Sequence, residues 1–436
     1  MKIHILTATV LLTLASSDAV AQSGTNSPYS RYGLGRVADQ SIGMSRGMNG
    51  VGMAFREKQH VNYLNPSAYS AIDSLTFLFD VGMSLQNTNF KENGKSKNAK
   101  NGDFEYAVGG FRLLRHVGMA FGIMPYTNVG YNYSSTSDVE GYKMSPSLQE
   151  STTVTTTFSG SGGLHQIFVG AGWEPLRGVS VGMNLNYVFG NLNNSVATSY
   201  SDGYARTMTK SYGADVSSIK LDFGASYTMQ LPNRNSMTLG ITYTPGYKTG
   251  SDSECSIITK NEQSAVNDTT LYKAENSLAI PTQLGVGISY KHAEKWLLGF
   301  DYSLQRWSAI NGVAYTGDGN TVGYTDSYND RHHLAFGGQY CKNPSSRQFT
   351  DRLRYRFGAS YTSSYLKING KDGPDEFSLS AGLGVPIQNK YNTRSIVNVA
   401  LQWSRASAKN MLTENTFLIN IGITFNERWF DKWKFE

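Results

Sequence analysis

The chain has 436 residues, of which 17% are charged and 12% are aromatic, and its formal net charge is +6. A disordered chain would carry more charge and fewer aromatic side chains, and a nucleic-acid-binding chain would cluster its basic residues, which this sequence does not do. With 45 glycines, 27 tyrosines and no Pro-rich or Gly/Ser-rich linker, the composition favours one large β domain.

The N-terminus has the pattern of an export signal. Lys2 precedes a mostly apolar stretch at residues 3–15, and Ala19-Val20-Ala21 supplies small residues at a cleavage-site spacing. The apolar stretch is shorter than the roughly 20 residues that span a bilayer, which disfavours an anchor helix. We therefore expect residues 1–21 to be a cleaved signal peptide and the mature chain to begin at Gln22.

Residues 22–74 lack the strand pattern and are rich in Gly, Met and aromatic residues. So much apolar content ahead of the first strand needs a place to be buried, which predicts a plug inside a wide barrel. Met44 and Met48, spaced i, i+4 with Phe55 nearby, either pack the plug or form an adaptable surface for an acyl chain.

From residue 75 to residue 425, apolar and small polar residues alternate in segment after segment. One example interleaves Val181, Met183 and Leu185 with Gly182 and Asn184. This pattern is typical of transmembrane β-barrels. We count about 14 strands, which start near Leu75, Phe104, Val117, Ser151, Val179, Val216, Met237, Leu278, Trp296, His332, Leu353, Phe377, Ile396 and Phe417.

Long polar connections alternate with tight turns along this region. Residues 87–102, 134–148 and 191–213 are expected as outer loops, and 114–116 is an example of a tight turn. A soluble β-sandwich has no reason to alternate its loop lengths, whereas outer-membrane barrels do so regularly. The expected fold is all-β: an antiparallel transmembrane barrel with an N-terminal hatch in its lumen, followed by a periplasmic tail at residues 426–436.

Three motifs resemble the FadL-type transporters of long-chain fatty acids and hydrocarbons. They are Ser30-Arg31-Tyr32-Gly33-Leu34-Gly35-Arg36, then Asn62-Tyr63-Leu64-Asn65-Pro66-Ser67-Ala68, and Asn128-Val129-Gly130. Ser67 stands where the family's hatch signature has Ala. The resemblance implies a 14-stranded barrel in the bacterial outer membrane, a hatch in the lumen, and an inward kink in the third strand. It also implies a solute path along the hatch, for which we select Tyr32, Leu34, Met44, Met48, Phe55, Asn65 and Pro66.

The third and fourth predicted strands both carry residues that disturb a β-ladder. Pro125 cannot donate a hydrogen bond, and it is followed by Asn128 and Gly130. If the hairpin turns near Gly141, Pro125 lies opposite about Thr157. We predict a lateral opening between these two strands, bounded by Pro125, Asn128, Gly130, Gly160, Gly162 and Gly163.

No catalytic motif, cofactor site or metal site is predicted. Gly33-x-Gly35-x-x-Ala38 lacks the strand that precedes a dinucleotide fingerprint. His332 and His333 are adjacent on a strand, so they face opposite sides and do not bind one metal together. We expect no disulfide between Cys255, in an outer loop, and Cys341, near the periplasmic end of a strand.

The function expected from the sequence is passive uptake of a hydrophobic, fatty-acid-like small molecule through the lumen and a lateral opening. The chain is expected to be a monomer in contact with outer-membrane lipid and to bind no nucleic acid. The alternative is a barrel that serves as a partner or adaptor of a protein-secretion or surface-assembly complex and transports no solute.

Overall fold

The structure is a computed structural model that describes residues 24–145, 148–202, 204–261, 263–264, 267–315, 322–325, 328–388 and 394–428. The expected signal peptide and residues 429–436 of the expected tail lie outside the described residues.

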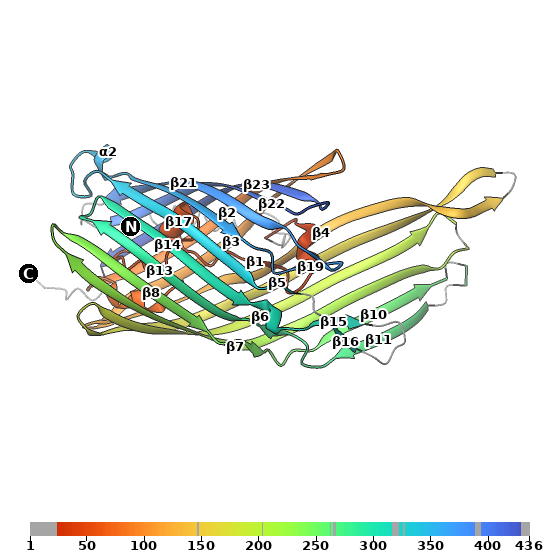
Figure 1. The fold of residues 1–436 in the computed structure, drawn as a ribbon, viewed down its shortest axis with the longest axis horizontal. Coiled ribbons are helices and arrows are strands. Elements are labelled where there is room, and N and C mark those ends of the chain that lie inside the picture. Colours follow the sequence, from red (N-terminus) through yellow and green to blue (C-terminus); the bar gives the residue numbers. More distant parts are fainter. Residues whose placement is uncertain are drawn as a thin grey trace, which may run out of the picture.

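Fourteen antiparallel strands form a closed wall, which confirms the predicted fold class (Figure 1). Each wall strand pairs with the next along the chain, and the first pairs with the last, because Thr76 lies opposite Arg428. The wall strands are β2 (Thr76–Glu92), β3 (Lys95–Leu114), β4 (Val117–Ser145), β5 (Leu148–Leu176), β6 (Val179–Tyr200), β7 (Thr207–Leu231), β8 (Asn235–Thr244), β13 (Thr282–His292), β14 (Trp296–Arg306), β17 (Arg331–Cys341), β18 (Arg354–Thr362), β21 (Asp375–Gln388), β22 (Arg394–Ser407) and β23 (Thr413–Arg428).

The alternation in the sequence corresponds to the two faces of the wall. On β6, Met183 and Leu185 are exposed on the outside, whereas Asn184 and Asn186 are buried on the inside. An apolar outer face and a polar inner face are what a barrel in a bilayer requires.

Several expected loops are instead strands that continue past the apolar band. Residues 87–92, 95–102 and 191–200 belong to wall strands, and β7 pairs with β10 (Ser253–Lys260), which pairs with β11 (Asn267–Ala274). Strands β4 to β7 therefore form, with β10 and β11, a sheet that projects from one end of the barrel (Figure 1). We assign this end to the cell exterior, because outer-membrane barrels carry their long connections there.

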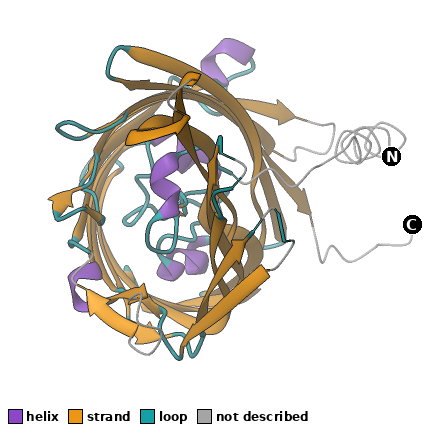
Figure 2. Cartoon of the chain, turned by 90° about the vertical axis from the view of Figure 1, so that its right-hand side faces the viewer, coloured by secondary structure: helices purple, strands orange, loops and turns teal. Residues whose placement is uncertain are grey.

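Residues 24–74, called the inner segment below, lie within the ring of strands (Figure 2). The segment contains the 3₁₀ helices η1 (Pro28–Arg31), η2 (Gly43–Met48) and η3 (Pro66–Ala71), and the short strand β1 (Arg36–Val37). Glycines of the wall let the two backbones meet, since an added Cβ would come within 3.0 Å of the inner segment at Gly118, Gly172, Gly182, Gly224, Gly240, Gly337, Gly358 and Gly382.

The remaining elements are short and lie in connections. They are β9 (Tyr247–Lys248), β12 (Ala279–Ile280), β15 (Gly312–Tyr315), β16 (Val322–Thr325), β19 (Lys367–Ile368), β20 (Lys371–Asp372), η4 (Trp307–Ala309) and α2 (Phe349–Arg352). No helix among the described residues has the length and apolar content to cross a membrane. Cys255 lies on β10, not in a loop as expected, Cys341 ends β17, and both thiols are free.

Candidate functional site

The third wall strand, β4, separates from its neighbour β3 early in its length and stays paired with β5. Its ladder with β3 ends at the pair Ala107 and Ile123. Beyond that point β4 pairs with β1 of the inner segment, with Arg36 opposite Asn128 and Val37 opposite Thr127. The strand therefore bends into the lumen at the place where the Asn128 motif predicted a kink.

The inner segment satisfies backbone groups that β3 no longer reaches. Ala38 N donates to Tyr126 O at 3.0 Å, and Gln40 Nε2 donates to Pro125 O at 3.0 Å. Gly130 N donates to Ser30 Oγ at 3.1 Å. Since Pro125 has no N–H to offer, its position at the bend costs no ladder hydrogen bond on that side.

The ladder between β4 and β5 continues past the kink. A register shift between Pro125 and Thr127 is the only irregularity in this part of it, and Pro125 lies opposite His165, not Thr157. The predicted register was wrong because the hairpin closes at Ser145 and Leu148, beyond Gly141. The interrupted ladder is the one between β3 and β4, so the predicted opening between β4 and β5 does not correspond to a break in the wall.

The glycine run of β5 allows close approach of neighbouring strands. Gly162 has φ +107° and Gly163 has φ +143°, and a Cβ at either position would strike the backbone oxygen of Asn191 or Thr127. Gly160 lies against the ring of Tyr131 on the kinked strand. These glycines therefore serve the packing of β5 against its two neighbours.

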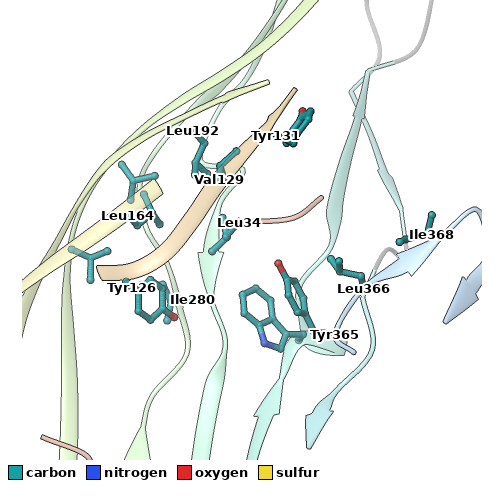
Figure 3. Close-up of a cluster of buried hydrophobic side chains, with 13 residues drawn as sticks. Leu34, Tyr126, Val129, Tyr131, Leu164, Leu192, Ile280, Tyr365, Leu366 and Ile368 are labelled. Atoms are coloured by element: carbon teal, nitrogen blue, oxygen red, sulfur yellow. The ribbon is translucent and has the colours of Figure 1, made fainter. Parts of the chain in front are cut away.

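An apolar cluster, called the outer cluster below, surrounds the kink (Figure 3). Leu34 of the inner segment lies at its centre, Tyr32 packs against it, and the rings of Trp307 and Tyr365 stack with centroids 4.3 Å apart. The Tyr365 hydroxyl donates to Gly35 O. Its buried members are Leu34, Tyr126, Val129, Tyr131, Leu164, Val188, Leu192, Val216, Ile280, Trp307, Tyr365, Leu366 and Ile368.

A cavity of about 260 Å³ adjoins the outer cluster, sharing Tyr126 with it. Most of the residues that line it are polar or charged, unlike those of a purely hydrocarbon-binding pocket. The charged and titratable residues that line it are Arg36, Asp39, Arg46, Glu105, Lys220, Asp222, Asp301, Arg331, His333 and Glu376.

Three of the four cations that line the cavity have acidic partners. Arg36 lies 2.8 Å from Glu376, Arg46 lies 2.9 Å from Glu105, and Lys220 lies 2.7 Å from Asp222. Arg331 forms no ion pair with any residue that the structure describes, and its Nη1 donates to Gln305 Oε1 at 3.4 Å. The cavity thus presents one guanidinium that has no ion-pair partner among the described residues.

Met44, Met48 and Phe55 are packing residues and do not line the cavity. They form a buried cluster with Val51, Leu297 and Ala335, which supports the packing interpretation of the two methionines. The apolar side chains of the inner segment that do reach the cavity are Val37, Ala38, Met53 and Leu64.

Asn65 and Pro66 begin helix η3, which leads toward β2. Asn65 is extended, with φ −140° and ψ 104°, as the residue before a proline should be. Its Oδ1 accepts from Ser67 N at 3.1 Å, and its Nδ2 donates to Met53 O at 2.7 Å and to Ala225 O at 3.2 Å. The pair therefore ties the inner segment to itself and to the wall strand β7.

His60 is a buried titratable group of the inner segment outside the cavity. Burial, together with the nearby charge of Arg356, lowers the pKa of its ring to about 3. The ring is therefore neutral at physiological pH. Among the described residues, no group of three or more His, Cys, Asp or Glu side chains is arranged to hold a metal ion.

Sequence reasoning missed Arg331 and the ion pairs of the lumen. Arg36 and Glu376 are 340 positions apart, so no local sequence pattern predicts their contact. The only sequence signal for these residues is a charge at an inward position of a wall strand, where most neighbouring inward residues are Ser, Thr, Asn or Gly.

A family model described as BamG matches residues 1–436 of the chain. No curated protein matches the sequence.

Solved structures of FadL-type barrels share the fold, as the sequence motifs suggested. The Ralstonia pickettii toluene transporter TbuX has 17% identity and a TM-score of 0.62, over 90% of this chain and 99% of that one. The CymD monoaromatic hydrocarbon channel has 16% identity and a TM-score of 0.58, over 89% and 98%. A Pseudomonas aeruginosa FadL homologue has 12% identity and a TM-score of 0.63, over 89% and 99%.

Proposed function

Since this chain belongs to the BamG family and is an outer-membrane β-barrel, we propose that it is a passive channel for amphipathic small molecules with an anionic head, such as long-chain fatty acids. The proposal rests chiefly on Arg331, an arginine without an ion pair among the described residues, in a cavity that adjoins an apolar cluster.

The two halves of such a solute match the two parts of the site. A carboxylate would accept charge-assisted hydrogen bonds from Arg331 in the cavity, while an acyl chain would lie against Tyr126 and the outer cluster around Leu34. Arg331 favours such a solute over a plain hydrocarbon, because a hydrocarbon would offer this guanidinium no anionic partner. The toluene transporter TbuX and the monoaromatic hydrocarbon channel CymD have the same fold, which supports a role in the passage of small apolar molecules.

The exit that we propose lies between β3 and β4, where the wall ladder stops. The side chain of Asn26 donates to Lys100 O on the unpaired edge of β3, and Gly24 lies against the Asp103 carboxylate. The start of the inner segment thus covers this edge. A shift of the inner segment away from β4 would open a sideways route to the bilayer next to Asn128 and Gly130.

Uptake by proteoliposomes tests this function. Replacing Arg331 by Gln should weaken uptake of a long-chain fatty acid about ten-fold or more, as expected for losing a charged hydrogen bond of about 1.5–3 kcal/mol. Uptake of toluene should stay the same. Arg306→Gln, on the exposed outside of β14, is the matched control. Fatty-acid uptake that is equal in the Arg331 variant and the wild type would reject the proposed site.

A second function, that of a barrel partner in a secretion or surface-assembly complex, is favoured by the projecting sheet. Its edge strand β11 has one unpaired side among the described residues, and the side chain of Leu271 on it is 62% exposed. Exposed strand edges of this kind can pair with a strand of another chain. Replacing residues 253–274, which include β10 and β11, by an Asn-Gly turn should then abolish a stoichiometric partner complex and leave fatty-acid uptake intact.

A further inference from the structure

On the outer face of four adjacent strands, the side chains change from apolar to polar toward the exterior end of the barrel. On β22, β23, β2 and β3, outward side chains are apolar up to Trp403, Phe417, Leu85 and Phe104. The outward residues that follow include Asn87, Asn89, Asn98 and Asn415. This change marks the level at which the hydrocarbon of the outer leaflet gives way to lipid headgroups.

Four cations lie at and just beyond this level. Lys91 is on β2, Lys100 on β3 and Arg405 on β22, and Lys409 lies in the turn between β22 and β23. All four are exposed, and none forms an ion pair with a residue that the structure describes. We call these four residues the basic rim.

The strand register fixes the height of the basic rim. Lys100 pairs with Asn87, which pairs with Phe417, so the lysine stands level with the last aromatic residue of the band. Arg405 pairs with Asn415, one outward position higher. The two cations are three strands apart, roughly 14 Å at about 4.8 Å per strand.

The acidic residues of the same strands do not neutralise the rim. Glu105 is bound by Arg46 and Glu414 by Ser27, both inside the lumen. Glu92 lies opposite Lys95 on the face that carries the buried Thr88. At the level of the basic rim, the outward charges of these four strands are therefore all cationic among the described residues, and the outward Glu427 lies at the opposite end of β23.

We propose that the basic rim binds the phosphate-bearing headgroup of a lipid of the outer leaflet, with lipopolysaccharide as the occupant. The phosphates would contact Lys100, Arg405, Lys91 and Lys409, and the acyl chains would lie on Leu85 and Phe417 below them. Charge complementarity favours this occupant, since cations at the membrane surface attract anionic headgroups. The spread of the cations suits a headgroup with two separate phosphates, as opposed to one ion. The site is independent of any solute path through the lumen.

The test measures lipopolysaccharide bound to the purified full-length barrel in non-ionic detergent, by mass spectrometry of the intact complex and by titration. The variant K91Q/K100Q/R405Q/K409Q should bind at least ten-fold more weakly than the wild type. The matched control R115Q/R177Q/R234Q/K295Q removes the same charge from exposed turns at the opposite end and should bind like the wild type. Equal binding by both variants, or equal loss in both, would overturn the proposal.

Two further arms separate the lipid from a free anion and from a folding defect. Inorganic phosphate at millimolar concentration should not displace the lipid, and full displacement would identify a plain anion site and overturn the proposal. If the quadruple variant fails to assemble, the single variants Lys91→Gln and Lys409→Gln in exposed positions carry the test. Each should lower binding at least two-fold, K91R/K409R should retain it, and unchanged binding in both single variants would overturn the proposal.

Discussion

Asn65 shows how single side chains hold the inner segment in place. Its amide bridges Ser67, Met53 and Ala225, so one residue joins helix η3, the preceding loop and the wall. Sequence reasoning found this residue because Asn before Pro is a local signal. Arg331 gave no such signal, since its lack of an acidic partner depends on strands far away in the chain.

Replacing Asn65 by Ala should make the inner segment less tightly held, while the barrel wall stays folded. The loss of the η3 cap and of the hydrogen bond to the Met53 carbonyl should lower the stability of the inner segment by about 1–3 kcal/mol, because buried polar groups are left without hydrogen bonds. The measurement is protease cleavage within residues 22–74 of folded protein, which should become faster. Asn98→Ala, at an exposed position of β3, is the control, and equal cleavage of both variants would contradict this role.

Gly162 should be essential for assembly. Leu at this position would adopt φ +107° and meet the Asn191 carbonyl, and strained backbone alone costs about 1–3 kcal/mol. We expect the fraction of folded Gly162→Leu barrel in the membrane to fall several-fold. Gly370→Leu is the control, since Gly370 has φ +74° with nothing within 4 Å. A Gly162→Leu barrel that assembles like the control would show that the close contact is unimportant.

At the scale of elements, the kink in β4 is the feature that joins wall, inner segment and outer cluster. The β3–β4 ladder ends at Ile123, and β1 continues the pairing from inside at Thr127 and Asn128. Under the proposed function, this short β1–β4 pairing must separate when a solute leaves sideways.

A cross-link across this pairing should therefore block passage. Val37 and Thr127 are register partners, and paired residues of antiparallel strands lie about 4.5–5.5 Å apart at Cα, within disulfide range. In a background without the two native cysteines, Val37→Cys with Thr127→Cys should reduce fatty-acid uptake at least ten-fold. A reducing agent should restore it.

The control cross-link joins Met119 and Ala171, partners in the intact part of the β4–β5 wall ladder. It should leave uptake unchanged. Normal uptake by the oxidised Val37–Thr127 variant would mean that the inner segment does not move away from β4 during passage.

The sequence predicted the number of wall strands because apolar residues alternate wherever lipid covers the outside, but β3 and β7 begin at Lys95 and Thr207, well before the expected starts at Phe104 and Val216. The prediction failed beyond the apolar outer belt of the wall. Residues 87–92 and 95–102 are strand, yet Lys and Asn are common on both faces there, so apolar residues no longer alternate with polar ones. The misplaced turn near Gly141 shifted the register of Pro125 by eight positions, from Thr157 to His165. Register in long, polar strands is weakly specified by side-chain pattern.

At the scale of the whole molecule, the closed ring leaves no wall edge from β2 to β23 except at the kink. Closed barrels pair their backbone groups internally and resist detergent until heated. We expect the mature protein to fractionate with the outer membrane and to migrate differently on gels before and after boiling. Recovery from the soluble periplasm without detergent would contradict this architecture.

The pairing of β4 with residues that precede the first wall strand also has a consequence for the order of biogenesis. The Pro125–Gly130 stretch of β4 completes its hydrogen bonds with Ser30, Ala38 and Gln40. Backbone groups left unpaired at this depth cost several kcal/mol each, so the sheet is not complete until the N-terminal part of the chain lies against its inner side. Once β23 meets β2, the ring is sealed around that part. We therefore expect the barrel to assemble around its own N-terminal part, with the β2–β23 pairing formed after that part is in place.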